Sequence, residues 1–230
     1  MRIDLSKYLT ERYLESISEQ KFEGPVVTIA RQFGCPAKSV AAKLVSRLTE
    51  IKSKKAKKMD WRFINKEILH ESAKLLDVDP EEIQYVFRYE TRSVFADIIS
   101  SYSRKYYKSD RKIRNTIARV IRNIASEGNV VIVGRGGVAI TRDIQKSLHI
   151  KLEAPIDWRA LRVSEKYCLS IEEATKYAND VDRKRALFRD YFHGTGSDYT
   201  RFDMIFNSMT LSMDEIVEST INMMKLKNLI

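Results

Sequence analysis

A lysine–serine pair, Lys38-Ser39, follows closely after the first strongly apolar segment of the chain. That segment, Val26–Ala30, predicts a buried strand, and apolar residues at helical spacing over 38–49 predict a helix behind it. A strand–turn–helix unit directs loop amides and a helix N-terminus toward one point, which favours an anion. The phosphate-loop pattern G-x-x-x-x-G-K-[ST] ends in the same pair. Gln32 and Ala37 replace its glycines, so an ordinary strand-to-helix turn is the alternative interpretation.

An arginine between glycines follows the second buried segment. Asn129–Val133 predicts a strand, and Gly134, Arg135 and Gly136 come directly after it. In open parallel sheets, ligands bind at the carboxyl ends of the strands. An arginine in this position has few structural reasons to be there, so we expect Arg135 to bind a phosphate group.

The order of the remaining elements indicates how these residues are positioned. Further strands are expected at 149–152 and 204–206, and helices fill most of the chain between strands. Asp157 is expected to cap a short helix, and Ser170 and Ser212 each open a helix with a glutamate three residues later. Strands that alternate with helices predict an α/β fold with a parallel sheet covered on both faces.

Composition narrows the class of protein. The 230 residues include 41 Lys and Arg against 31 Asp and Glu, a net charge of +10, which favours anionic partners. No apolar run is long enough for a membrane span, and the first fifteen residues show no signal peptide. Cys35 and Cys168, the two cysteines, make no disulfide framework. We therefore expect a cytoplasmic protein that does not bind membranes.

Several segments together resemble the cytidylate kinase-like family, a divergent group of nucleoside monophosphate kinases. The resemblance extends over about residues 25–226. The matching segments are Ile-Ala-Arg-Gln-Phe-Gly at 29–34, Gly-Arg at 134–135, Asp-Arg-x-Arg-Ala at 182–186, and the final strand and turn at 203–215. Three positions depart from the family: Cys35-Pro36-Ala37 replace Ser-Gly-Gly, Asn65 replaces an acceptor-side aspartate, and Gly136 replaces the aspartate after Gly-Arg.

The resemblance implies a three-layer P-loop nucleotide-kinase fold over residues 23–230. A small helical acceptor-binding insertion is expected at about 61–108 and a lid at about 178–198. Residues 1–22 fall outside the match, and their apolar spacing predicts an amphipathic helical extension. This extension needs an apolar surface, either the core or a second subunit, and we favour the second subunit and hence a homodimer.

The same resemblance implies ATP-dependent phosphoryl transfer to a nucleoside monophosphate, with CMP or dCMP as the preferred acceptor. Lys38 would contact the β- and γ-phosphates and Ser39 would place its hydroxyl on Mg²⁺. Catalysis would rest on Lys38, Arg135, Arg183 and Arg185, because positive charge stabilises the transferring phosphoryl group. Further nucleotide contacts are expected from Gly34 and Thr210. Acceptor contacts are expected from Asn65, Ser101, Arg114, Arg135, Asp182 and Arg189.

Two other functions are compatible with the sequence. A nucleotide-binding or regulatory protein that has lost turnover would explain the phosphate loop without its glycines. A nucleic-acid-binding protein would explain the net charge, the lysine run at 52–58 and the basic residues over 104–122. The second alternative is less favoured because no nucleic-acid-binding module is recognisable and a phosphate-binding cleft also requires basic charge.

Overall fold

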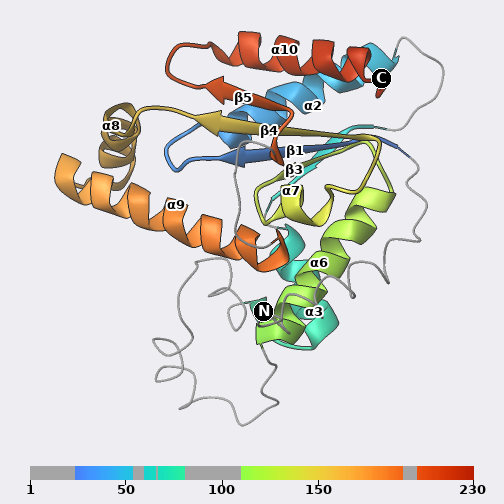
Figure 1. The fold of residues 1–230 in the computed structure, drawn as a ribbon, viewed down its shortest axis with the longest axis horizontal. Coiled ribbons are helices and arrows are strands. Elements are labelled where there is room, and N and C mark those ends of the chain that lie inside the picture. The colour runs from blue at the N-terminus through green and yellow to red at the C-terminus, as the bar shows by residue number, and fades with distance from the viewer. Residues whose placement is uncertain (1–23, 54–59, 66, 81–109, 194–200) are drawn as a thin grey trace, which may run out of the picture.

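The centre of the molecule is a parallel sheet of five strands in the order β2-β3-β1-β4-β5 (Figure 1). The computed structural model describes residues 24–53, 60–65, 67–80, 110–193 and 201–230. The strands are β1 (Val26–Arg31), β2 (Arg62–Ile64), β3 (Val130–Val133), β4 (Ser147–Glu153) and β5 (Met204–Asn207). The strand before Lys38 is therefore central and pairs in parallel with the strand before Arg135.

Helices cover both faces of this sheet. They are α2 (Ala37–Ser53), α3 (Glu67–Leu76), α6 (Asp110–Ser126), α7 (Gly137–Ile140), α8 (Ile156–Tyr167), α9 (Ile171–His193) and α10 (Met213–Leu226). α2 and α10 lie against one face, and α3, α6, α7 and the end of α9 lie against the other (Figure 1). The predicted three-layer α/β fold is confirmed.

Side chains of β3 show why the strands are continuous apolar runs. Val130 and Ile132 pack into the core under α3 and α6, whereas Val131 and Val133 pack into the core under α2 and α10. All four are fully buried. A strand with helices on both faces has no solvent side, so its sequence loses the alternation of a surface strand.

Several local predictions differ from the structure in detail. β1 continues one residue further than predicted, to Arg31. Pro155, not Asp157, occupies the N-cap of α8. Asp157 lies in the first turn, where its negative charge interacts favourably with the positive end of the helix dipole. The predicted capping boxes at Ser170 and Ser212 both form, each with the glutamate three residues later.

Parts of the expected acceptor region and lid are described. The strand β2 begins the region expected at 61–108 and joins the edge of the central sheet, and α3 follows it. Within the region expected as a lid, residues 178–193 belong to the continuous helix α9. The expected extension 1–22 and residues 81–108, including Ser101, lie outside the described residues.

A buried polar network joins β1 to β4. The ring of His149 lies 2.8 Å from the Thr28 hydroxyl through Nδ1 and 3.1 Å from the Ser147 hydroxyl through Nε2. Its backbone N–H donates to Asp203. Burial lowers the pKa of His149 to about 4, because the charged ring would lose its water. His149 is therefore neutral at physiological pH.

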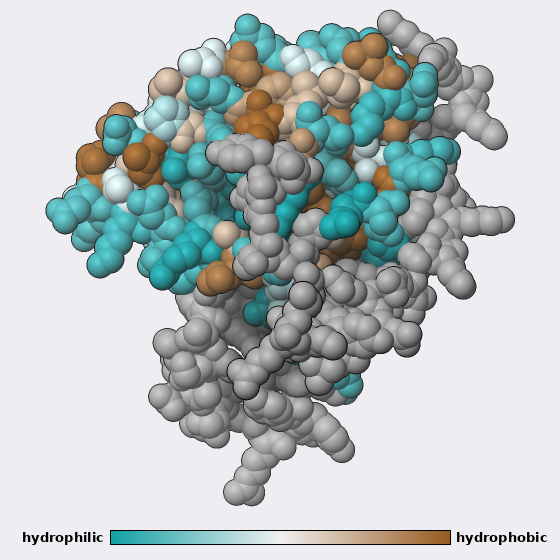
Figure 2. Space-filling view, in the orientation of Figure 1, coloured by the Kyte–Doolittle hydropathy of each residue, from teal (hydrophilic) through white to brown (hydrophobic). Residues whose placement is uncertain are grey.

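Most of the described surface seen in Figure 2 is hydrophilic, and apolar side chains gather near the junction of α8 and α9. Exposed large hydrophobic residues of that region include Leu161, Tyr167, Ile171 and Tyr177. None of the described helices has the length and apolar character that crossing a membrane requires.

Candidate functional site

The turn between β1 and α2 brings Lys38 and Ser39 to the N-terminus of α2, where the sequence placed them. Both side chains are exposed in the first helical turn. The N–H groups of a first turn have no partner within the helix, so they are available to an anion. Gly34 precedes the helix at φ 97°, and a Cβ there would lie 3.0 Å from the Cβ of Arg159. Glycine at this position lets α8 pack directly under the turn.

Most amides of this turn already have acceptors. Gln32 donates to the carbonyl of Leu152 at 2.9 Å, and Phe33 donates to Asp182 Oδ1 at 2.7 Å. The amides of Cys35 and Ala37 bond to carbonyls within the turn itself, and Pro36 has no N–H. A phosphate would therefore meet the first amides of α2 and side-chain cations rather than a full cradle of loop amides.

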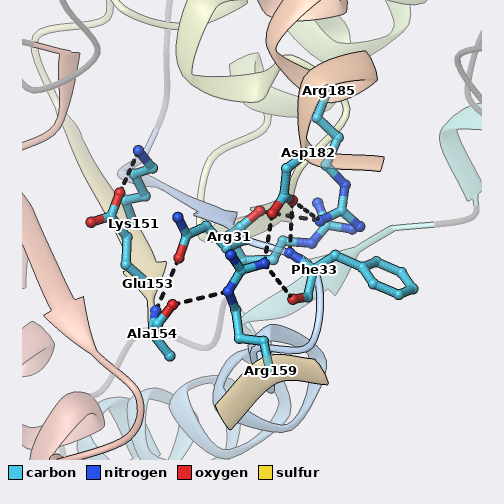
Figure 3. Close-up of polar contacts among 9 residues, drawn as sticks. Arg31, Phe33, Lys151, Glu153, Ala154, Arg159, Asp182 and Arg185 are labelled. Carbon is cyan, nitrogen blue, oxygen red and sulfur yellow. Dashed lines mark hydrogen bonds and ion pairs between the residues drawn. The ribbon is translucent and has the colours of Figure 1, made fainter. Parts of the chain in front are cut away.

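A cluster of buried and partly buried charges holds the turn against α8 and α9 (Figure 3). Arg159, which is 4% exposed, donates to the carbonyls of Ala154 and Phe33 and to Asp182 Oδ2 at 2.8 Å. Arg185 of α9 lies 3.5 Å from Asp182 Oδ1 and donates to the carbonyl of Arg31 at 3.2 Å. Burial raises the pKa of Asp182, while the Phe33 amide and the two arginines oppose the rise.

The turn, α8 and α9 enclose a cleft of about 390 Å³, which we call the donor cleft. Residues 31–39 form its floor, and Arg185 lines it from α9. Side chains of α8 complete the wall: Arg162, Val163, Lys166 and Tyr167. Burial raises the pKa of the Cys35 thiol in this cleft, so the thiol stays protonated.

A second, smaller pocket of about 50 Å³ lies at the carboxyl ends of β1 and β3, and we call it the acceptor pocket. The glycine turn 134–137 forms one side. Its cationic lining residues are Arg31, Arg135, Lys151, Arg185 and Arg189. Arg135 has φ 58° and donates from Nε to the carbonyl of Asn65 at 3.2 Å. Lys151, 9% exposed, pairs with Glu153 at 2.5 Å.

The structure brings together most of the cations that the sequence singled out. Gly34, Lys38 and Ser39 line the donor cleft, Arg135 and Arg189 line the acceptor pocket, and Arg185 lines both. Asp182 holds the turn, and Asn65 contacts Arg135 through its backbone carbonyl. Lys151 and Arg31 were not singled out, although Arg31 stands in the Ala-Arg-Gln-Phe-Gly segment at the end of a strand, a signal that could have identified it.

Three candidates lie elsewhere. Arg183 is 71% exposed, pairs with Asp180 and lines neither pocket. Arg114 stacks on the rings of Tyr191 and Phe188, 4.7 and 5.4 Å from their centroids. The Thr210 hydroxyl is exposed in the turn after β5 and donates to the carbonyl of Asn207 at 3.5 Å.

Comparison with known proteins agrees with this geometry. The parallel sheet, with cations at its strand ends and a lysine at a helix N-terminus, defines a protein of the P-loop kinase type. Residues 26–210 match the sequence profile of the cytidylate kinase-like family, and the chain belongs to that family.

Two individual proteins show the extent of the similarity. A cytidylate kinase of Methanococcus aeolicus is 26% identical over 115 residues, which are 49% of this chain and 65% of that protein, so the match spans just under two thirds of the relative. The crystal structure of an uncharacterized protein from Eubacterium ventriosum superposes with a TM-score of 0.62 at 19% identity, over 88% of this chain and 99% of that one. The second similarity concerns the fold alone.

Proposed function

We propose that this protein transfers the terminal phosphoryl group of ATP to a nucleoside monophosphate, with CMP or dCMP as the preferred acceptor. The observation that carries the proposal is the contact between the donor cleft and the acceptor pocket at the carboxyl ends of the strands, where Arg31 and Arg185 line both. Two adjoining sites for phosphate groups are what transfer between two phosphorylated molecules requires. Membership of the cytidylate kinase-like family supports the choice of acceptor.

The donor phosphates are assigned to the N-terminus of α2. Lys38 supplies a flexible cation there, and the first-turn amides supply hydrogen-bond donors. Mg²⁺ is assigned to the same place, because Ser39 lines the cleft with a hydroxyl-bearing side chain and this ion takes most of its ligands from phosphate oxygens and water. The ion would neutralise charge that develops on the phosphates during transfer.

The acceptor phosphate is assigned to the small pocket beside Arg135. Its volume suits a phosphate group rather than a nucleoside, and Arg189 and Lys151 add positive charge. The nucleophile is an oxygen of an ionised phosphate, so no general base is needed to remove a proton. Positioning and positive charge are then the main contributions of the protein, which these residues supply.

A second function is favoured by the phosphate turn itself. The Phe33 amide is bonded to Asp182, and Pro36 contributes no amide. A turn of this kind is compatible with a protein that binds a nucleotide weakly and uses the bound state as a signal without turnover. The two functions share the same cleft and differ only in whether phosphoryl transfer follows binding.

Incubation of the full chain with Mg·ATP and CMP, dCMP or UMP tests the proposal by chromatography of the nucleotide products. We expect ADP and the matching diphosphate to form together, and Lys38→Ala to lower the rate by about a hundredfold, as expected for a lost contact to the transition state. Lys43→Ala is the matched control, because Lys43 belongs to the same helix and pairs with Asp214 away from the cleft.

Calorimetry with ATP distinguishes the two functions. Binding of ATP without transfer to any monophosphate would favour the regulatory protein. No binding at millimolar ATP would contradict both.

A further inference from the structure

Arg31 ends β1, the central strand of the sheet, and its backbone is held on two sides. The residue pairs with Leu152 of β4 in the parallel register. Its carbonyl accepts a hydrogen bond from Arg185 Nη1 at 3.2 Å. A side chain that starts from a central strand has a well-defined origin, because the strand is fixed by its neighbours. Arg31 therefore differs from Arg185, which belongs to the helix that covers the cleft.

The guanidinium of Arg31 lies against the glycine turn that carries Arg135. An ideal Cβ at Gly134 would lie 1.7 Å from Arg31 Nη1 and 2.9 Å from its Cζ. Gly134 has φ 71°, and its amide donates to the carbonyl of Ile29 at 3.0 Å. The absence of a side chain at Gly134 thus makes room for the Arg31 guanidinium, and Arg31 and Arg135 line the same pocket.

Of the described residues, only Arg31 and Arg185 line both the donor cleft and the acceptor pocket. In an in-line transfer the migrating phosphoryl group must lie between donor and acceptor, where both sites can contact it. Charge in the transition state spreads over its equatorial oxygens. The planar guanidinium, with several N–H donors in a fixed fork, matches such oxygens.

We infer that Arg31 is a catalytic residue that contacts the phosphoryl group during transfer. This inference rests on the proposed function. The acceptor phosphate oxygen bonds to the γ-phosphorus while the bond from that phosphorus to the β,γ-bridging oxygen breaks, leaving ADP and a nucleoside diphosphate. Arg31 remains protonated throughout and stabilises the charge on the migrating group. The sheet holds it ready before the substrates arrive, which avoids reorganisation during the reaction.

Arg31→Gln and Arg31→Lys test the inference, with Arg119→Gln as the control because Arg119 is exposed on α6 and lines neither pocket. In steady-state kinetics with ATP and CMP, we expect Arg31→Gln to lower kcat by about a thousandfold, as for other transition-state arginines, with each KM changed by less than about threefold. Arg31→Lys keeps the positive charge without the forked guanidinium donors, so its kcat should lie between those of wild type and Arg31→Gln. Circular dichroism and thermal unfolding establish that each variant folds.

A binding measurement makes the test independent of turnover. The probe is adenosine joined to cytidine through a pentaphosphate bridge, which places phosphate in both pockets at once. We expect Arg31→Gln to weaken calorimetric binding of this probe by at least about tenfold, the loss of a charge-assisted hydrogen bond, while ATP alone binds as before.

The outcomes separate the inference from the proposed function. Wild-type turnover with an unchanged kcat in folded Arg31→Gln would overturn the role of Arg31 and leave the kinase function intact. Binding of the linked probe through Arg31 without any turnover would contradict the proposed function and retain Arg31 as a contact to the bridging phosphates. A wild-type protein that binds neither ATP nor the probe would overturn both.

Discussion

The turn after β1 and the turn after β3 border adjoining pockets, but they supply positive charge in different ways. In the first turn, the amides of Gln32, Phe33, Cys35 and Ala37 are bonded within the protein, and charge comes from Lys38 at a helix N-terminus. Around the second turn, side-chain cations from β1, β4, the turn itself and α9 line a pocket of about 50 Å³. The donor cleft is the larger site and offers few unbonded loop amides to a phosphate, whereas the acceptor pocket is small and lined by several cations.

This difference separates binding from chemistry. Contacts that hold ATP equally well before and during reaction affect KM, whereas contacts made only to the migrating phosphoryl group affect kcat. The bonded amides of the first turn predict modest ATP affinity. The arginines shared by both pockets predict that the chemical step is better preserved than the binding of ATP. Substitutions on each side should therefore change different kinetic constants.

The largest change in kcat is expected from substitution of Arg185, because this residue lines both the donor cleft and the acceptor pocket. Arg185→Gln should lower kcat by about a thousandfold, because the variant loses a positive charge that both pockets share. Arg183→Gln is the matched control, two residues away on the same helix, where its side chain is 71% exposed and pairs with Asp180. We expect that control to stay within about twofold of wild type in a coupled ADP assay. Equal losses in the two variants would contradict the placement of the catalytic charge.

A smaller effect, on stability, is expected from His149, whose partner Thr28 lines the acceptor pocket. The folded pKa of about 4 lies below the unfolded value of 6.5, so the unfolded chain binds the extra proton first. The free energy of unfolding should therefore fall as pH drops from about 6.5 to 4, by about 3 kcal/mol from this residue. Asp203 opposes and Lys227 reinforces the lowered pKa.

Urea unfolding at several pH values measures this dependence. His149→Gln should flatten the fall, whereas His70→Gln, at an exposed position on α3, should leave it unchanged. A wild-type stability that is constant between pH 6.5 and 4 would contradict a neutral, buried His149.

The smallest effect is expected from the missing amide of the donor turn. Pro36→Ala supplies a backbone N–H at a half-buried position without the full backbone freedom of glycine. Pro36→Gly supplies both the N–H and that freedom. Because Pro36 lines the donor cleft, Pro36→Ala should lower the KM for ATP by about threefold with little change in kcat. The CMP KM serves as the internal control, because Pro36 does not line the acceptor pocket. A lowered kcat with an unchanged ATP KM would contradict the separation of the two sides.

The sequence predicted the fold because its signals are local. The short, continuous apolar runs of β1 and β3 are rich in β-branched residues and so favour strands covered on both faces, and Ser170 and Ser212 marked their helix starts through contacts three residues away. Lys38 and Arg135 were identified because each follows a buried strand, and the ends of parallel strands meet at one edge of a sheet. The parallel sheet and the two cation-bearing turns therefore follow from local pattern, whereas the full strand order comes from the structure.

Other features depend on contacts between residues far apart in the chain. Arg183 and Arg185 share one motif, yet the direction of each on α9 decides that only Arg185 lines the pockets. Asp182 is bonded to the Phe33 amide, 149 positions away, and no local pattern states that pairing. Arg31 acquires its place because Gly134 leaves room for its guanidinium. The sequence by itself determined the layers and which strand ends carry charge, and the tertiary structure decided which charges meet, since side-chain direction is set by packing.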